Sequence, residues 1–165
     1  MNTLNLYTAS RRDVALIQKL AEPAWWAVYG PILSDEQVDF MLKEFYSTPA
    51  LTQLIDNGDQ EFVLLEANGT AVGFAAFSHK PEEKAFKLNK LYLLPEMKGM
   101  GYGKVLIDEV ITRVDRLGGN ILDLNVNRYN ASKGFYERMG FEVIYEEDIP
   151  VGKFFMNDYV MRKTW

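Results

Sequence analysis

Residues 85–94 have the composition of a β-strand whose side-chain alternation changes phase partway along. The apolar residues before Asn89 occupy even positions, and those after Lys90 occupy odd positions. Because successive side chains of a strand point to opposite faces of a sheet, one extra residue restores a single apolar face. The pattern therefore predicts a β-bulge, which leaves backbone groups unpaired and available. The alternative is an edge strand flanked by Lys87 and Lys90.

The remaining patterns predict a mixed α/β layer, with helices packed on a largely antiparallel sheet. Capping signals and apolar spacing predict helices, whereas short apolar runs predict strands. Asn68-Gly69 suits a tight hairpin turn, and Pro23 is expected to disturb the first helix. The expected strands cover 1–8, 62–67, 71–77, 85–94, 122–127, 141–147 and 154–161, and the expected helices cover 10–23, 34–45, 48–58, 104–118 and 131–139.

Composition limits the classes of protein to consider. With 165 residues, 48% of them hydrophobic, the chain is expected to form a single domain over residues 1–165. We expect a cytoplasmic protein, because no leader or membrane-length apolar run is apparent. There is no cysteine, and His79 is the only histidine, which argues against thiol chemistry, metal sites and a serine triad. A net charge of −5 argues against nucleic-acid binding.

A glycine-rich turn, Lys98 to Lys104, connects the bulged strand to an amphipathic helix. Free N–H groups and the helix dipole at such a place can bind phosphate, although a plain connection is the alternative. The dinucleotide fingerprint needs glycine where Lys104 stands, and the P-loop needs Ser or Thr where Val105 stands. Neither nucleotide motif is therefore present.

The turn resembles the pyrophosphate loop of the GNAT acetyltransferases, which has a basic residue or glutamine, two variable positions, glycine, one variable position and glycine. Lys98, Gly101 and Gly103 match it, and Leu91 to Pro95 precede it as in that family. The resemblance implies the GNAT fold, a mostly antiparallel seven-stranded sheet with helices on both faces and a splayed, bulged central strand. It also implies acetyl-coenzyme A as co-substrate and no metal.

A second segment, Asn127 to Phe141, resembles the last coenzyme-binding segment of the same family. By this resemblance Asn130 contacts the pantetheine arm, and Tyr136 protonates the departing thiolate. The usual asparagine stands seven residues before the tyrosine, a place that Tyr129 occupies here. The alternative makes Phe135 and Tyr136 ordinary core aromatics.

The resemblance assigns the remaining coenzyme contacts residue by residue. The N–H of Leu93 is implied to polarise the thioester carbonyl, so the implied catalytic groups are Leu93 and Tyr136. The implied coenzyme-binding residues are Leu91, Leu93, Lys98, Gly99, Met100, Gly101, Tyr102, Gly103, Lys104, Asn130 and Tyr136.

The acceptor site is less defined by the sequence. Trp26 and Tyr29 are expected to bind the acceptor, in an aromatic pocket that also includes Trp25, Phe45 and Tyr46. The acidic neighbours of this pocket are Glu22, Asp35, Glu36 and Asp39. The general base is open, with His79, Glu82 and Glu83 as candidates. Core aromatics and solvated acids are the alternative.

Three hypotheses about function follow. The first is acetylation of a small primary amine, such as a diamine or polyamine, by direct attack in a ternary complex. It is implied by a resemblance to a bacterial GNAT subgroup that includes polyamine acetyltransferases, which is carried by Trp26, Tyr29, Leu33, Gln37, Met41, Tyr46 and Asp158 to Met161. This hypothesis includes a small-molecule partner, neither nucleic acid nor membrane, and a homodimer that rests on the resemblance alone. The second is acetylation of a protein or peptide amine. The third is a silent coenzyme-binding module that regulates a partner.

Overall fold

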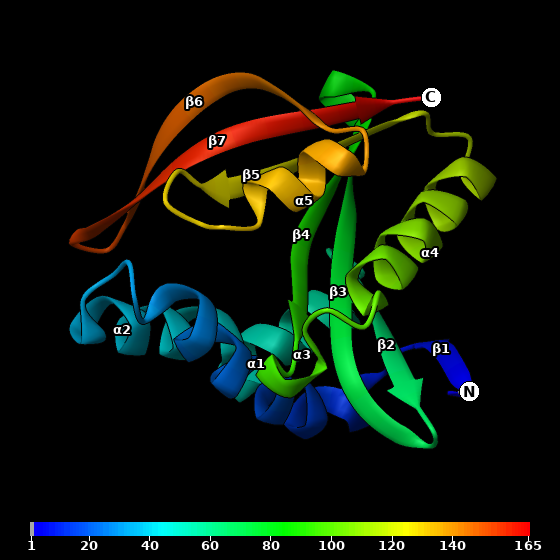
Figure 1. Cartoon of the computed structure of the whole chain (residues 1–165), viewed down its shortest axis with the longest axis horizontal. Helices are drawn as coiled ribbons and strands as arrows, with labels where there is room; N and C mark the ends of the chain where they lie inside the picture. Colours follow the sequence, from blue (N-terminus) through cyan, green and yellow to red (C-terminus); the bar gives the residue numbers. More distant parts are fainter. Residues whose placement is uncertain (1) are drawn as a thin grey trace.

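The computed structural model describes residues 2–165, which form one seven-stranded sheet between two layers of helices (Figure 1). The strand order is β1-β2-β3-β4-β5-β7-β6, and every neighbouring pair is antiparallel except β4 and β5. The strands are β1 Leu4–Thr8, β2 Glu61–Ala67, β3 Thr70–Lys80, β4 Ala85–Leu93, β5 Ile121–Asn127, β6 Glu142–Val151 and β7 Phe154–Thr164. The α-helices are α1 Val14–Tyr29, α2 Asp35–Tyr46, α3 Thr48–Asp56, α4 Tyr102–Arg116 and α5 Lys133–Arg138. The expected fold class is confirmed.

Local capping explains where the helices begin. The Ser10 N–H donates to the Asp13 carboxylate at 2.8 Å, and the Gln37 N–H donates to the Ser34 hydroxyl at 3.1 Å. The prediction that the first helix is disturbed at Pro23 is wrong, because α1 continues to Tyr29. Pro23 lies on the exposed side of α1, where water can bond the carbonyl that loses its partner. The opposite side of α1 is buried and stabilises the helix.

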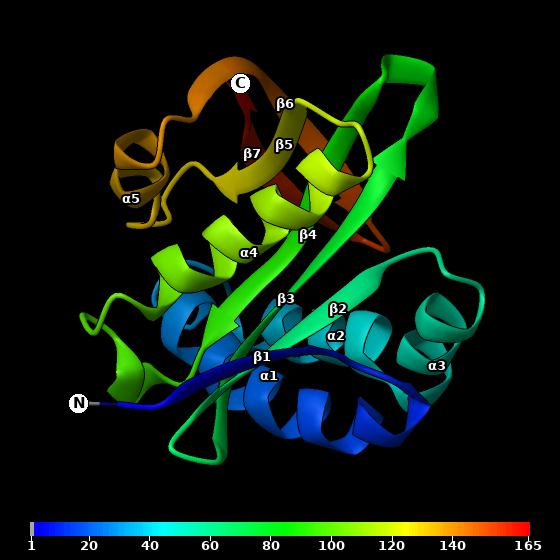
Figure 2. The same cartoon turned by 90° about the vertical axis from the view of Figure 1, so that its right-hand side faces the viewer.

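Two apolar cores lie on opposite faces of the sheet. The first packs α4 against β2, β3, β4 and β5, and the second packs α1, α2 and α3 against the other face. Figure 2 shows α4 on one side of the sheet and α1, α2 and α3 on the other. Each core therefore fixes one side of β4, the strand that runs between them.

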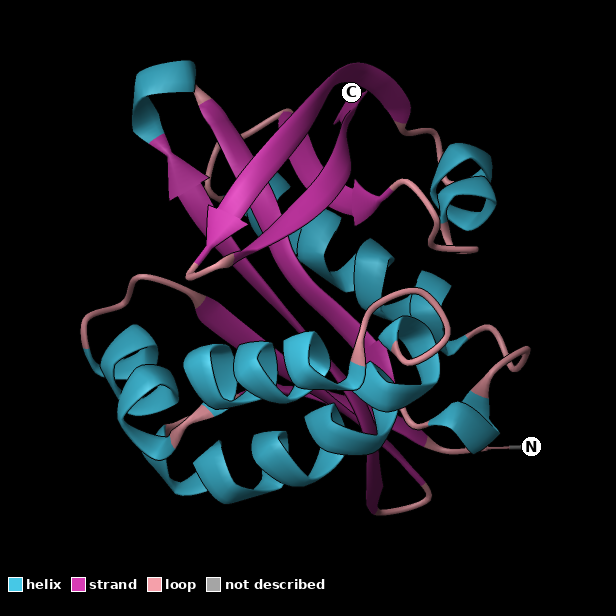
Figure 3. Ribbon diagram, turned by 90° about the vertical axis from the view of Figure 1, so that its left-hand side faces the viewer, coloured by secondary structure: helices cyan, strands magenta, loops and turns pink. Residues whose placement is uncertain are grey.

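The β6–β7 hairpin reaches back to α2, as Figure 3 shows. The Phe40 and Phe154 rings lie 5.5 Å apart, and Lys153 pairs with Glu36 at 2.6 Å. Segments far apart in the sequence are thus in contact, and residues of both line one cavity.

Among the helices of residues 2–165, none combines the length and apolarity that a membrane crossing demands.

Candidate active site

The bulge in β4 is confirmed at the position that the alternation predicts. Lys90 pairs with Ala76, and Leu88 pairs with Phe77, so Asn89 is the extra residue. The Asn89 amide nitrogen donates to the Ser78 hydroxyl at 2.8 Å and to the Lys87 carbonyl at 3.2 Å. These bonds hold the bulge in place although it lacks a ladder partner.

Beyond the bulge, β4 and β5 separate. Their parallel pairing covers only residues 86–88 of β4 against residues 122–124 of β5, although both strands continue. The Leu94 N–H donates to the Val72 carbonyl on β3 at 2.9 Å. Because backbone groups alternate along an antiparallel ladder, the N–H groups of Leu91 and Leu93 point away from β3, toward the opening beside β5.

The glycine-rich segment supplies a second set of free N–H groups. Gly99 and Gly101 have φ angles of +83° and +81°, and a Cβ at either position would meet no atom within 4 Å. Within residues 2–165, no backbone acceptor pairs with the N–H groups from Gly99 to Lys104. Six consecutive donors at the N-terminus of a 15-residue helix can bind a phosphate group.

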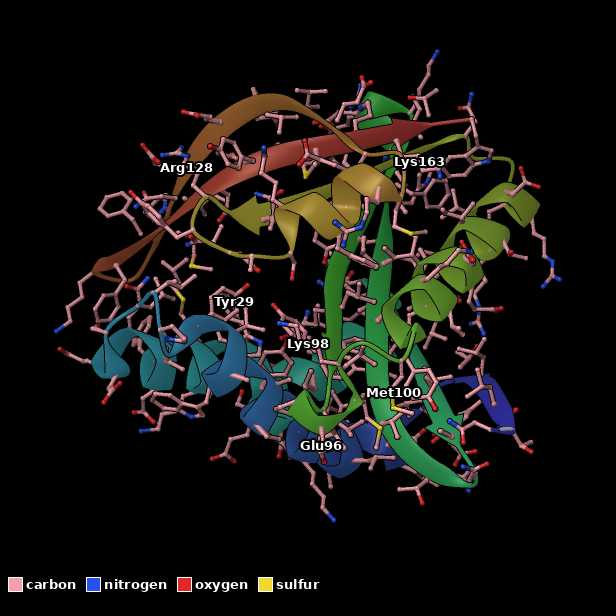
Figure 4. All side chains as sticks on the ribbon, viewed as in Figure 1. Tyr29, Glu96, Lys98, Met100, Arg128 and Lys163 are labelled. Atoms are coloured by element: carbon pink, nitrogen blue, oxygen red, sulfur yellow. The ribbon has the colours of Figure 1, made fainter. Side chains whose placement is uncertain are left out.

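The side chains of this segment have different environments. Lys98 and Met100 are exposed on the connection between β4 and α4 (Figure 4). Lys104 is exposed and pairs with Asp108 at 2.6 Å, whereas the Tyr102 ring is buried against the core beside α4. Tyr102 can therefore offer its backbone, not its phenol, to a ligand at the helix N-terminus.

A slot of about 50 Å³ lies between the separated strands. Its lining includes Leu91, Asn130, Ser132 and Tyr136. The Asn130 side-chain oxygen accepts from the Ser132 N–H at 2.8 Å, which fixes the turn before α5. Burial, and next the Tyr29 hydroxyl, raise the pKa of Tyr136 well above its usual value, so its phenol holds a proton at neutral pH.

A larger cavity of about 260 Å³ adjoins the slot. Tyr29, Leu88, Asn89, Lys90, Tyr92 and Asn125 line both spaces. The wall of the larger cavity is completed by Trp25, Phe45 and Tyr46 from the helices and by Ile149, Val151 and Met156 from the β6–β7 hairpin. A molecule in this cavity would therefore lie directly beside the slot.

Tyr29 stands at the junction of the two spaces. Figure 4 places it between α1 and β5, and its hydroxyl lies 3.2 Å from that of Tyr92. Burial raises the pKa of Tyr29 to about 12, and the charge of Asp158 adds to the rise while the Tyr92 contact opposes it.

The larger cavity contains ionisable groups of both signs. Burial, and then the charge of Lys87, lower the pKa of Lys90 to about 8. The Lys90 ammonium donates to the Gln60 side-chain oxygen at 2.6 Å and lies 5.3 Å from the Phe62 ring centroid. Burial also lowers the pKa of Lys87 and raises that of Asp158.

The structure brings together most of the aromatic residues that the sequence grouped as an acceptor pocket. Tyr29 lines both spaces, and Trp25, Phe45 and Tyr46 line the larger one, but Trp26 lines neither. The four acidic neighbours expected there, Glu22, Asp35, Glu36 and Asp39, are exposed outside the lining. The three candidate bases, His79, Glu82 and Glu83, are exposed near the far end of β4, and His79 stacks on Phe86 at 4.5 Å.

The sequence reasoning used Asp158 only as part of a family resemblance and did not place it in the site, although it lines the larger cavity and is only 5% exposed. A signal was present in the strand pattern. Met156, Asp158 and Val160 share one face of β7, so a charged residue stands in an otherwise apolar row.

Comparisons with known proteins agree with this geometry. The Acetyltransferase (GNAT) domain family matches residues 30–161, about four fifths of the chain. A spermidine N(1)-acetyltransferase of Thermoplasma acidophilum is 27% identical over 99% of this chain and 98% of its own. A [ribosomal protein bS18]-alanine N-acetyltransferase of Haemophilus influenzae is 30% identical over 47% of this chain and 51% of its own.

A solved structure gives the corresponding comparison in three dimensions. The crystal structure of a PaiA N-acetyltransferase from Thermoplasma acidophilum in complex with coenzyme A superposes with a TM-score of 0.84, at 27% identity, over 99% of both chains. The free N–H groups at the start of α4 and the opening between β4 and β5 fit a long, phosphate-bearing thioester. The chain belongs to the GNAT acetyltransferase family and is an acetyl-coenzyme A-dependent N-acetyltransferase.

Proposed function

We propose that this enzyme acetylates the primary amine of a small molecule, by direct attack of the amine on the thioester of acetyl-coenzyme A. The observation that carries the proposal is the junction of the narrow slot with the larger cavity through six shared residues. A thioester in the slot and an amine in the cavity would meet without an intervening protein layer. Holding two reactants in such proximity lowers the entropic part of the barrier.

The donor would be held mainly by backbone groups. The N–H groups from Gly99 to Lys104 would bind its diphosphate, with the Lys98 side chain close by. The Leu91 and Leu93 N–H groups, which point toward the opening beside β5, would bond the arm and polarise the acetyl carbonyl. Asn130 would contact the same arm from the loop before α5.

Proton transfer would involve Tyr136. Its phenol lines the slot, and its raised pKa keeps it protonated, which is the state a general acid requires. When bound, the co-substrate supplies an activated acetyl group on sulfur. Since the chain contains no cysteine, a thiol of the protein cannot take the acetyl group first. Attack by the amine in its neutral form, with its second proton lost after the N–C bond forms, is the simplest route.

Three observations support a small acceptor, with diamines and polyamines as the first compounds to test. The β6–β7 hairpin and α2 both contribute to the wall of a cavity of about 260 Å³, a volume suited to a small molecule. The spermidine acetyltransferase matches nearly the full length of this chain. The cavity wall is aromatic, which suits an ammonium group.

A protein amine is the second candidate, and the partial match to the bS18-alanine acetyltransferase favours it. Thiol release from acetyl-coenzyme A separates the two candidates. We expect release with 1,4-diaminobutane or spermidine and none with an alanine-starting peptide. Release with the peptide alone would overturn the small-molecule proposal in favour of the second candidate.

We further propose that residues 1–165 act as one catalytic domain and that two copies can associate, which size measurement in solution would test.

A further inference from the structure

Asp158 is a buried carboxylate with one oxygen left unpaired. Its residue is 5% exposed, on β7 between Asn127 of β5 and Glu147 of β6. One carboxylate oxygen accepts from the Asn125 side-chain amide at 3.2 Å. Among the described residues, the other oxygen has no hydrogen-bond partner. A buried unpaired oxygen destabilises a fold, so such a group calls for a role outside folding.

The cations nearest to Asp158 do not neutralise it. Arg128 pairs with Asp148 at 2.9 Å and with Glu146 at 3.9 Å, both on β6. Lys87 lies close enough to affect the pKa of Asp158, but within residues 2–165 no side chain forms an ion pair with this carboxylate. Asp158 thus has no ion-pair partner within the described residues, and it lines the larger cavity.

The walls around Asp158 suit an organic cation. Trp25, Phe45 and Met156 line the same cavity, and aromatic faces attract an ammonium group. Asp158 also raises the pKa of Tyr29, which places its charge near the junction with the slot. A diamine with one ammonium group beside Asp158 could therefore place its other amino group close to the junction with the slot.

We propose that the carboxylate of Asp158 binds one ammonium group of a diamine acceptor, so that the other amino group, in its neutral form, is directed toward the slot. This inference rests on the proposed function, because it assigns the residue that receives the amine. Asp158 then selects a cationic acceptor over an uncharged one of the same shape. A purely structural role, in which Asp158 only orients Asn125, makes no such distinction.

The test compares Asp158→Asn with the unmodified enzyme, both loaded with coenzyme A. The amide keeps an oxygen for Asn125 and removes the charge. We expect calorimetry to show about tenfold to a hundredfold weaker binding of 1,4-diaminobutane to the variant, since bonds to charged groups are the strong ones. Binding of 1,4-butanediol, the uncharged analogue, should be equally weak in both. The exposed Asp59→Asn is the matched control and should bind the diamine normally.

Diamine affinity measured at several pH values distinguishes binding by Asp158 from a purely structural role, which would not make the affinity depend on the protonation of Asp158. Diamine affinity should fall as Asp158 takes up a proton, at a pH above the pKa of an ordinary aspartate. Burial, and also the charge of Glu147, raise the pKa of Asp158, while Asn125, Lys87 and Arg128 oppose this rise. The Asn variant should lack this dependence. Equal diamine affinity in variant and unmodified enzyme, or no diamine binding at all, would overturn the inference. Asp158-dependent binding without any acetyl transfer would support it while refuting the proposed function.

Discussion

Replacing Lys104 by proline removes one of the free N–H groups from the proposed diphosphate site. Lys104 is the third residue of α4, after Gly101 at the N-cap. Proline is tolerated in the first turn of a helix, where the N–H has no partner in the helix. The residue before a proline is restricted mainly through its Cβ and N–H, and Gly103 has no Cβ. The substitution should therefore leave the fold intact and delete a single donor.

The expected loss follows from the number and type of donors. A hydrogen bond to a charged group contributes about 1.5–3 kcal/mol, which corresponds to about a 10- to 150-fold change in affinity. Lys104→Pro also removes an ammonium group, which is paired with Asp108. Lys104→Ala is therefore the reference, and the effect of the N–H is the difference between the two variants.

Calorimetric titration with coenzyme A measures this difference. Asp35→Pro, at the first residue of α2, controls for a proline in a helical first turn away from the site. It should bind coenzyme A as the unmodified enzyme does. Thermal unfolding of all three variants checks that the fold is retained.

Equal coenzyme A affinities for Lys104→Pro and Lys104→Ala would refute the reasoning. That result would mean that this N–H group does not contact the diphosphate, and the assignment of the Gly99 to Lys104 segment would lose its main support. A loss in Asp35→Pro of the same size would point to general destabilisation instead.

Three further substitutions test the ionisable groups of the site. Tyr136→Phe should lower kcat by about 10²- to 10⁴-fold in a thiol-release assay while coenzyme A binding persists, because the phenol is assigned only to proton donation. Lys90→Met should raise the free energy of unfolding at pH 7 by up to about 3 kcal/mol, because the Lys90 pKa falls from 10.5 to about 8 on folding. Urea titrations at pH 7 and pH 10.5 measure this difference. Asp158→Asn should raise the free energy of unfolding at pH 7 by about 1–3 kcal/mol, because it removes a buried unpaired charge. Urea titration of the variant and the unmodified enzyme measures this difference.

The two stability effects depend on pH in opposite directions. The unfolded chain holds the Lys90 proton more tightly, so the penalty is complete below pH 8 and disappears as the pH rises toward 10.5. The folded chain holds the Asp158 proton more tightly, so that penalty is absent at low pH and develops above the usual aspartate pKa. A stability gain of Lys90→Met that persists at pH 10.5, an Asp158→Asn gain that persists at pH 3, or full kcat in Tyr136→Phe would each contradict the corresponding assignment.

Features that depend on neighbouring residues were predictable from the sequence. The phase change in β4 placed the bulge, because strand alternation is fixed by backbone geometry alone. The Asn68-Gly69 turn appears with both φ angles positive, +54° and +81°, as a tight hairpin requires. A capping residue predicted the start of α2, and a proline in the first turn predicted the start of α3, for the same local reason.

Features that depend on distant parts of the chain were not predictable. Whether Trp25 or Trp26 faces the cavity depends on how α1 is rotated against the sheet, and the continuation of α1 through Pro23 was not anticipated. The environment of Asp158 requires β5, β6, β7 and α1 to meet, and only the folded structure brings them together. The pKa of Lys90 likewise reflects burial that no local pattern reports.

The single extra residue at Asn89 connects the two halves of the site. Before the bulge, Phe86 and Leu88 face the core beside α4, and after it Leu91 and Leu93 face that same core. Without the insertion, the phase of the strand after this point would be reversed, and Lys90 would be directed into the α4 core. The bulge instead turns Lys90 toward the larger cavity and the Leu91 and Leu93 N–H groups toward the opening beside β5. The one extra residue thus places the proposed donor and acceptor sites on adjacent sides of the same strand.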